Sequence, residues 1–286
     1  MHSTSATPEA AAAATAAVAV TAIDSHAHVF ERGLPLAPVR RHAPDYDATL
    51  SDYLTLFDEH GVSHAVLVQP SFLGTDNSFL LDALRRLPQR LRGVVMLDPA
   101  TPESELRALD ELGVCGLRLN LVGLPLPDLR GAAWQALLAR LRALDWHVEV
   151  HRGSADLAHC VQPLLDAGCK VVVDHFGRPD AALGLDDPGF RWLLRAADTG
   201  RVWVKLAAAY RSWPQQDAPG ACATAQALLR HFGADRLVWG SDWPNTQHRE
   251  VADFGSAQRA LAHWIPDAAA RARILLDTPA RLFRFL

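Results

Sequence analysis

The stretch His147-Val148-Glu149-Val150-His151 alternates three polar side chains with two valines. Successive side chains of a β-strand point to opposite faces, so His147, Glu149 and His151 share one face and the valines share the other. Three polar residues are costly to bury against apolar helices. We therefore expect a strand that packs its valines against helices and directs its polar face into the interior of a closed sheet.

Eight short apolar runs of this kind recur along the chain, at residues 21–24, 65–69, 93–97, 116–119, 147–150, 170–174, 202–206 and 237–239. Helix-like stretches separate most of them, at residues 77–87, 103–112, 134–144, 157–167 and 190–197. Alternating strands and helices predict an α/β fold with a parallel sheet. Eight units in this length fit a (β/α)8 TIM barrel. An open doubly wound sheet is the alternative, but no GxGxxG motif follows the first run.

Composition predicts one globular domain over residues 21–286 and a disordered, Ala-rich tail over residues 1–20. The chain is 49% hydrophobic with a formal charge of −4, which argues against a nucleic-acid partner. No apolar stretch reaches the length of a membrane span. We expect a cytoplasmic protein that does not bind membranes, and a homo-oligomer is left open.

Three polar motifs stand where apolar runs end: Asp-Ser-His-Ala-His at 24–28, Asp-His-Phe-Gly-Arg-Pro at 174–179 and Trp-Gly-Ser-Asp-Trp-Pro at 239–244. Barrel enzymes carry their chemistry at the carboxyl ends of the strands. The expected catalytic set is therefore His26, His28, His175 and Asp242. Imidazoles two residues apart on a strand project to one side, and Asp24 is expected to share that side.

Other polar residues near strand ends predict a site for a small anionic substrate. Three arginines have guanidinium groups that match carboxylates in shape and charge, namely Arg118, Arg178 and Arg211. Further candidates for substrate binding are Ser71, Thr75, Asn120 and His151. The long loop after the first run contributes Arg41, His42 and Tyr46 as candidates for a lid.

Together these motifs resemble the amidohydrolase superfamily, specifically its branch of 2-pyrone-4,6-dicarboxylate lactonases and sugar-acid lactonases. The similar segments are residues 23–28, 69–77, 116–120, 173–180, 239–244 and 278–283. The resemblance implies a (β/α)8 barrel that opens lactone rings with water, without a metal in the pyrone branch, in a route of aromatic degradation. It implies that Asp242 is the general base and that the three histidines polarise the carbonyl, while the three arginines hold carboxylates.

The chain departs from the pyrone branch at two places. Those enzymes carry a further arginine after the fourth strand, where this chain has Leu-Val-Gly-Leu-Pro at 121–125, and Arg130 is the only nearby substitute. The fifth strand offers Glu149, His151 and Arg152 where a substrate-binding tyrosine is expected. The lactone itself is therefore left open.

Two other functions use the same residues. In a metal-dependent amidohydrolase or decarboxylase, His26, His28, His175 and Asp242 would bind a zinc-like ion, with Glu149 as an additional ligand. Lys205 is the one candidate for a modified, metal-bridging lysine. A barrel that only binds an anion is the third alternative, since a fold does not fix a function. No metal or other cofactor is favoured.

Overall fold

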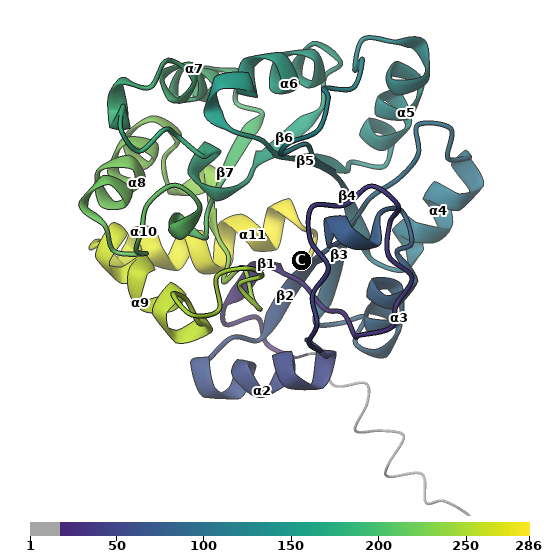
Figure 1. The fold of residues 1–286 in the computed structure, drawn as a ribbon, viewed down its shortest axis with the longest axis horizontal. Helices are drawn as coiled ribbons and strands as arrows, with labels where there is room; N and C mark the ends of the chain where they lie inside the picture. The colour runs from purple at the N-terminus through teal and green to yellow at the C-terminus, as the bar shows by residue number, and fades with distance from the viewer. Residues whose placement is uncertain (1–17) are drawn as a thin grey trace, which may run out of the picture.

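The computed structural model of the protein describes residues 18–286. Eight parallel strands form one sheet in chain order, and helices surround it (Figure 1). The strands are β1 (Ile23–Ala27), β2 (His64–Val68), β3 (Leu91–Val95), β4 (Val114–Asn120), β5 (His147–His151), β6 (Lys170–Val173), β7 (Val202–Leu206) and β8 (Leu237–Trp239). The predicted TIM barrel is confirmed. The predicted tail falls on residues 1–20, of which 1–17 lie outside the described residues.

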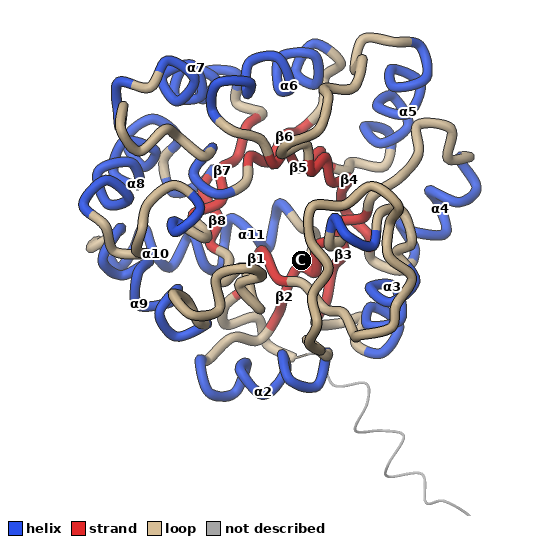
Figure 2. Tube along the Cα trace, in the orientation of Figure 1, coloured by secondary structure: helices blue, strands red, loops and turns tan. Residues whose placement is uncertain are grey.

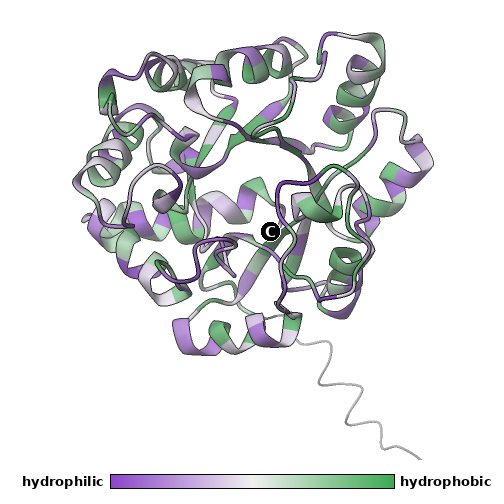
Figure 3. Ribbon diagram, in the orientation of Figure 1, coloured by the Kyte–Doolittle hydropathy of each residue, from purple (hydrophilic) through white to green (hydrophobic). Residues whose placement is uncertain are grey.

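Most of the helices form an outer layer around the ring of strands, whereas the last helix, at residues 278–282, lies across the ring (Figure 2). The helices are α2 (Leu50–His60), α3 (Ser78–Arg86), α4 (Glu103–Glu111), α5 (Ala132–Ala143), α6 (Ser154–Asp166), α7 (Pro188–Ala196), α8 (Pro219–Phe232), α9 (Phe254–Trp264), α10 (Ala268–Ala272) and α11 (Thr278–Leu282). Hydrophilic and hydrophobic residues alternate along these helices (Figure 3), as amphipathic helices require. None of the helices within residues 18–286 is long and apolar enough to cross a membrane.

Two apolar layers enclose the sheet. Val148 and Val150 of β5 belong to the large cluster between the strands and the outer helices. A smaller cluster inside the barrel joins Ile23 and Val66 to Phe283, which directly follows α11. The Phe283 ring lies 5.3 Å from the ring of His147, the first residue of β5. The C-terminal segment therefore closes the amino end of the barrel, and the carboxyl end is left for polar side chains.

A bulge in β1 changes which of its side chains face inward. The pairing with β2 shifts register between Asp24 and Ala27, so Ile23 lies in the interior cluster while Ala27 lies in the outer one. The Asp24 carboxylate accepts a hydrogen bond of 2.7 Å from the hydroxyl of Tyr53 on α2. The expectation that Asp24 shares a face with His26 is therefore wrong, because the bulge adds one residue to the alternation.

Backbone hydrogen bonds from the segment after β8 to β1 bring the ends of the sheet together. The Asp242 amide donates to the carbonyl of His26 at 2.9 Å, and the His28 amide donates to the carbonyl of Trp243 at 2.8 Å. At Gly240, a Cβ atom would lie 2.5 Å from the Cβ of His26. Only glycine permits this approach of the two segments.

Replacing Gly240 should disturb this closure. We expect Gly240→Ala to lower the free energy of unfolding by about 1–3 kcal/mol, because the added methyl overlaps the His26 backbone and Cβ. Gly153→Ala is the control, since a Cβ at Gly153 meets no atom within 4 Å and the φ of Gly153 is −67°. Because Gly153 is a helix N-cap, this substitution should lower the free energy of unfolding by less than about 1 kcal/mol. Urea denaturation measures both, and equal losses would contradict the close-packing argument.

Candidate active site

A cavity opens at the carboxyl end of the barrel. Six residues expected at the site line it, namely His28, Ser71, Arg118, Asn120, His151 and Arg211. The lining also includes Arg41, His42, Pro70, Phe72, Thr246 and Gln247. Three more of the expected residues, His26, His175 and Asp242, are buried close by. The two buried histidines pack against histidines of the lining. The ring centroids of His26 and His28 are 4.9 Å apart, and those of His175 and His151 are 4.7 Å apart.

The two carboxylate oxygens of Asp242 have different surroundings. Oδ2 accepts hydrogen bonds from the Tyr210 hydroxyl at 2.6 Å and from two nitrogens of Arg211 at 3.1 and 2.6 Å. Oδ1 has no hydrogen-bond partner among the described residues and lies 3.5 Å from Nε2 of both His26 and His28. Asp242 has a φ of 56°, in the left-handed region that costs energy for a non-glycine residue. One oxygen is thus anchored and the other is free for chemistry.

Hydrogen bonds at the Nδ1 atoms of His26 and His28 determine the tautomers of these two histidines. Nδ1 of His28 lies 2.7 Å from the carbonyl of Val68 and must donate to it, so a neutral His28 carries a lone pair on Nε2. Nδ1 of His26 lies 2.9 Å from the Lys205 ammonium, which can only donate, so a neutral His26 carries its proton on Nε2. With both histidines neutral, the free oxygen of Asp242 faces one N–H group and one lone pair.

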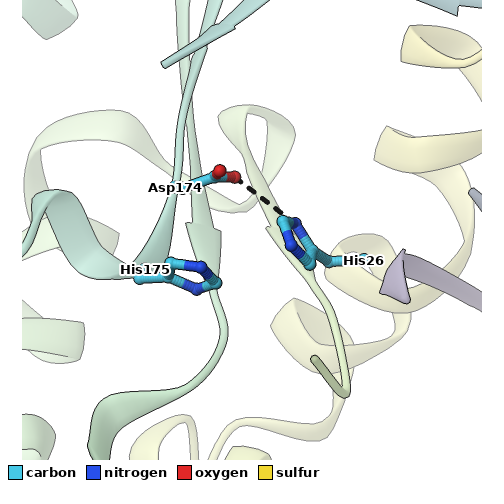
Figure 4. A group of neighbouring side chains, drawn as sticks. All are labelled: His26, Asp174 and His175. Carbon is cyan, nitrogen blue, oxygen red and sulfur yellow. Dashed lines mark ion pairs between the residues drawn. The ribbon is translucent and has the colours of Figure 1, made fainter. Parts of the chain in front are cut away.

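Below the histidines lies a buried group of charges. The Lys205 ammonium donates to the Glu149 carboxylate and lies 3.6 Å from Oδ1 of Asp174. Figure 4 shows Asp174 facing His26 beside His175, with a separation of 3.4 Å between the Asp174 oxygen and Nδ1 of His26. Nε of Arg118 lies 3.9 Å from Glu149, and its Nη2 lies 3.6 Å from Asp174. These carboxylates are compensated by the cations around them, as buried charges must be.

Burial and neighbouring charges move several pKa values in this site. Burial alone would raise the pKa of Asp242, but its neighbours, the Arg211 guanidinium first and then the surrounding histidines, together hold that pKa well below its usual value. Burial lowers the pKa of His26, His151 and His175 well below the usual value of a histidine. At neutral pH the site therefore holds an ionised Asp242 beside the uncharged imidazoles of His26, His151 and His175.

Three of the residues considered from the sequence lie elsewhere. Thr75 is exposed and does not line the cavity, because the turn after β2 directs it to solvent. Arg130 pairs with Asp166 at the surface, at 2.8 Å, and does not substitute for an arginine in the cavity. Arg152 pairs with Asp156 at 2.7 Å and donates to the carbonyl of Leu121, so it braces the loop after β4.

Arg178 and Arg211 were both expected to bind carboxylates of the substrate, but neither guanidinium is free in the cavity. Arg211 lines the cavity, but its guanidinium holds Asp242. Arg178 does not line the cavity, and its Nη2 donates to the carbonyl of Arg211 at 3.4 Å. Its φ of 45° places it among several strained residues in the loops that follow β6, β7 and β8.

Sequence reasoning missed two residues of the site. Tyr210 donates to Asp242 and accepts a hydrogen bond of 3.2 Å from the Asn245 amide. Asp174 faces His26, a contact that its place in the Asp-His-Phe-Gly-Arg-Pro motif does not by itself indicate. The available signal for both was their position directly beside a predicted site residue at a strand end, since Tyr210 precedes Arg211 and Asp174 precedes His175.

A family model for amidohydrolases matches residues 23–285 of this chain. The chain belongs to the amidohydrolase family. A 4-sulfomuconolactone hydrolase of Rhizobium radiobacter is 34% identical over 274 residues, covering 91% of this chain and 89% of that protein. A 2-pyrone-4,6-dicarboxylate hydrolase of Comamonas testosteroni is 30% identical over 275 residues, covering 92% and 90%.

Among solved structures, a Pseudomonas putida protein with the provisional name 2-pyrone-4,6-dicarboxylic acid hydrolase is 51% identical, with a TM-score of 0.87. The match covers 94% of this chain and 99% of that one. The resemblance to the lactonase branch of the amidohydrolases is therefore confirmed, and so is the expectation that the chain is an enzyme.

The donor set of this site can accommodate a divalent ion. Nitrogen and carboxylate atoms of His26, His28 and Asp242 lie within 4.8 Å of one another, as do those of His26, Asp174 and His175. The lone pair on Nε2 of His28 and the free oxygen of Asp242 suit a cation. In the first group His26 fits less well, because the Lys205 ammonium at Nδ1 leaves the proton of a neutral His26 on Nε2, the nitrogen that faces Asp242. A bound ion would activate water.

The two lysines of this amidohydrolase offer a matched test of the buried charge group. We expect Lys205→Met to lower the free energy of unfolding by about 3–5 kcal/mol, because it removes the cation that donates directly to the buried Glu149 carboxylate. Lys170→Met is the control. Lys170 pairs with Asp145 at 2.7 Å near the surface, and its loss should cost at most about 1 kcal/mol. Similar losses in urea denaturation would show that Lys205 does not compensate the buried carboxylates.

Proposed function

We propose that this amidohydrolase opens the ring of a small lactone that carries anionic groups, with Asp242 as the general base. The observation that supports this most directly is the division of the Asp242 carboxylate. One oxygen is held by Tyr210 and Arg211, and the other faces His26 and His28 without a hydrogen-bond partner in residues 18–286. The names of the relatives, which are hydrolases of anionic lactones, favour the same reaction.

In the proposed reaction, a water molecule binds beside the free oxygen of Asp242. Nε2 of a neutral His28 would accept a hydrogen bond from this water and so orient it. Asp242 accepts the other proton as the water oxygen attacks the lactone carbonyl. Because its pKa is held well below the usual value, Asp242 is ionised whenever substrate arrives.

The imidazoles would stabilise the negative charge that forms on the carbonyl oxygen. His26 offers an Nε2–H group whose direction is set by Lys205. His175 has no hydrogen-bond partner for either ring nitrogen among the described residues, so one N–H is available. Such preorganised donors are worth most where water is excluded. When the tetrahedral intermediate collapses, the ring C–O bond breaks and the leaving oxygen recovers the proton from Asp242.

The substitution Asp242→Asn tests the base. The amide keeps the shape of the side chain but does not accept a proton, so turnover should fall by about 10²–10⁴-fold with a small change in KM. Asp217→Asn is the control, because Asp217 is exposed in the loop after β7. Steady-state hydrolysis of 2-pyrone-4,6-dicarboxylate measures both variants. Near-normal turnover of Asp242→Asn would remove Asp242 from the role of base.

The alternative is a metal-dependent hydrolase or decarboxylase in which these residues are ligands. It is supported by the convergence of His28 and Asp242, and opposed by the proton that Lys205 places on Nε2 of His26. We expect chelator-treated enzyme, with its metal content determined, to keep its hydrolysis rate. Activity that disappears with the metal and returns when Zn²⁺ is added would instead assign the residues as ligands.

We retain several further predictions beside this proposal. The enzyme is expected to work in the cytoplasm on a small anionic substrate, without nucleic acid or membrane, and its assembly as a homo-oligomer stays a prediction. A place in aromatic degradation likewise rests on the substrates named for its relatives.

A further inference from the structure

The loop between β1 and α2 brings Arg41 to the cavity. Its Nη2 donates a hydrogen bond of 3.0 Å to Oδ1 of Asn120 at the end of β4. Its Cδ lies 3.5 Å from the position of a Cβ on Gly123, whose φ is 70°. The arginine stem therefore runs along a part of the β4–α5 loop that has no side chain. Two loops that are far apart in sequence meet over the cavity through this residue.

The charge of Arg41 is compensated differently from that of its neighbours. Arg211 forms an ion pair with Asp242, and Arg118 lies 3.6 Å from Asp174. Within residues 18–286, Arg41 has no carboxylate within 4 Å, and its partner Asn120 is neutral. Burial and the nearby Arg211 and Arg118 guanidinium groups lower the pKa of Arg41. An anion bound in the cavity would relieve this repulsion.

We propose that Arg41 binds a second anionic group of the substrate at the mouth of the cavity, and thereby selects lactones with two carboxylates over those with one. This rests on the proposed function. A guanidinium has five N–H donors, of which the structure assigns one to Asn120, so an edge remains for a carboxylate. The first carboxylate would lie deeper, towards Arg118. Arg41 is then a specificity residue, because its hydrogen bond goes to Asn120 and not to Asp242, the residue proposed as base.

Binding of an unreactive ligand tests this without relying on turnover. Isophthalate is a planar ring with two carboxylates in meta positions, and benzoate has one. Titration calorimetry should show isophthalate binding more tightly than benzoate to the wild-type enzyme. Arg41→Gln should raise the dissociation constant of isophthalate by about tenfold or more and leave that of benzoate nearly unchanged. Arg41→Lys should recover part of the loss, since it keeps the charge without the planar fork.

Arg40 provides the matched control for its neighbour. It is exposed and donates to the carbonyl of Ala37 in its own loop, so Arg40→Gln should bind both ligands as the wild type does. If Arg41→Gln weakens both ligands equally, or neither, or if the wild type does not prefer isophthalate, the proposal is overturned. Thermal denaturation of each variant checks that it is folded.

Kinetics separate this proposal from the proposed function. If the enzyme hydrolyses 2-pyrone-4,6-dicarboxylate, Arg41→Gln should raise KM with little change in kcat, because the lost contact holds substrate and transition state alike. If no lactone is hydrolysed by the wild type, the proposed function fails while the preference for isophthalate can still hold. A fall in kcat with unchanged KM would contradict a role in substrate binding.

Discussion

The site depends on how the barrel closes between β8 and β1. Two backbone hydrogen bonds join the segment after β8 to β1, from Asp242 to His26 and from His28 to Trp243. The hydrogen bonds that close the barrel between β8 and β1 therefore also place the carboxylate of Asp242 beside His26 and His28. The left-handed conformation of Asp242 is tolerated because this pairing holds its backbone on both sides. Gly240 permits the approach, and the geometry of the chemistry follows from it.

Beneath this contact the barrel holds charges where barrels commonly hold apolar side chains. Glu149 and Lys205 form an ion pair next to Asp174, and Lys205 also donates to His26. A buried ion pair contributes little net stability, because desolvation offsets the attraction. Here the pair has another consequence, because the Lys205 ammonium determines which nitrogen of a neutral His26 carries the proton. The interior of the barrel is thus linked to the orientation of a donor at the site.

The arginines of the site have two roles. Some compensate the charge of the enzyme's own carboxylates, and others are available to bind the substrate. Arg211 is held by Asp242, and Arg118 stands between the buried carboxylates and the cavity. Arg41 reaches the cavity from a loop that is not part of the barrel. Because loops vary more readily than strands, such a residue can change substrate preference without disturbing the catalytic centre.

The sequence by itself determined the alternation of strands and helices, the inward face of β5 and the residues that meet at the strand ends, because these follow from side-chain periodicity and from chain order in a parallel barrel. It did not determine the bulge in β1, which turns Asp24 outward, since a one-residue insertion leaves no mark in the apolar pattern. Only the tertiary structure decided that Arg211 holds Asp242, that Arg130 stays at the surface and that Arg41 reaches the cavity. Long side chains find their partners across distant segments, and spacing along the chain does not encode those distances.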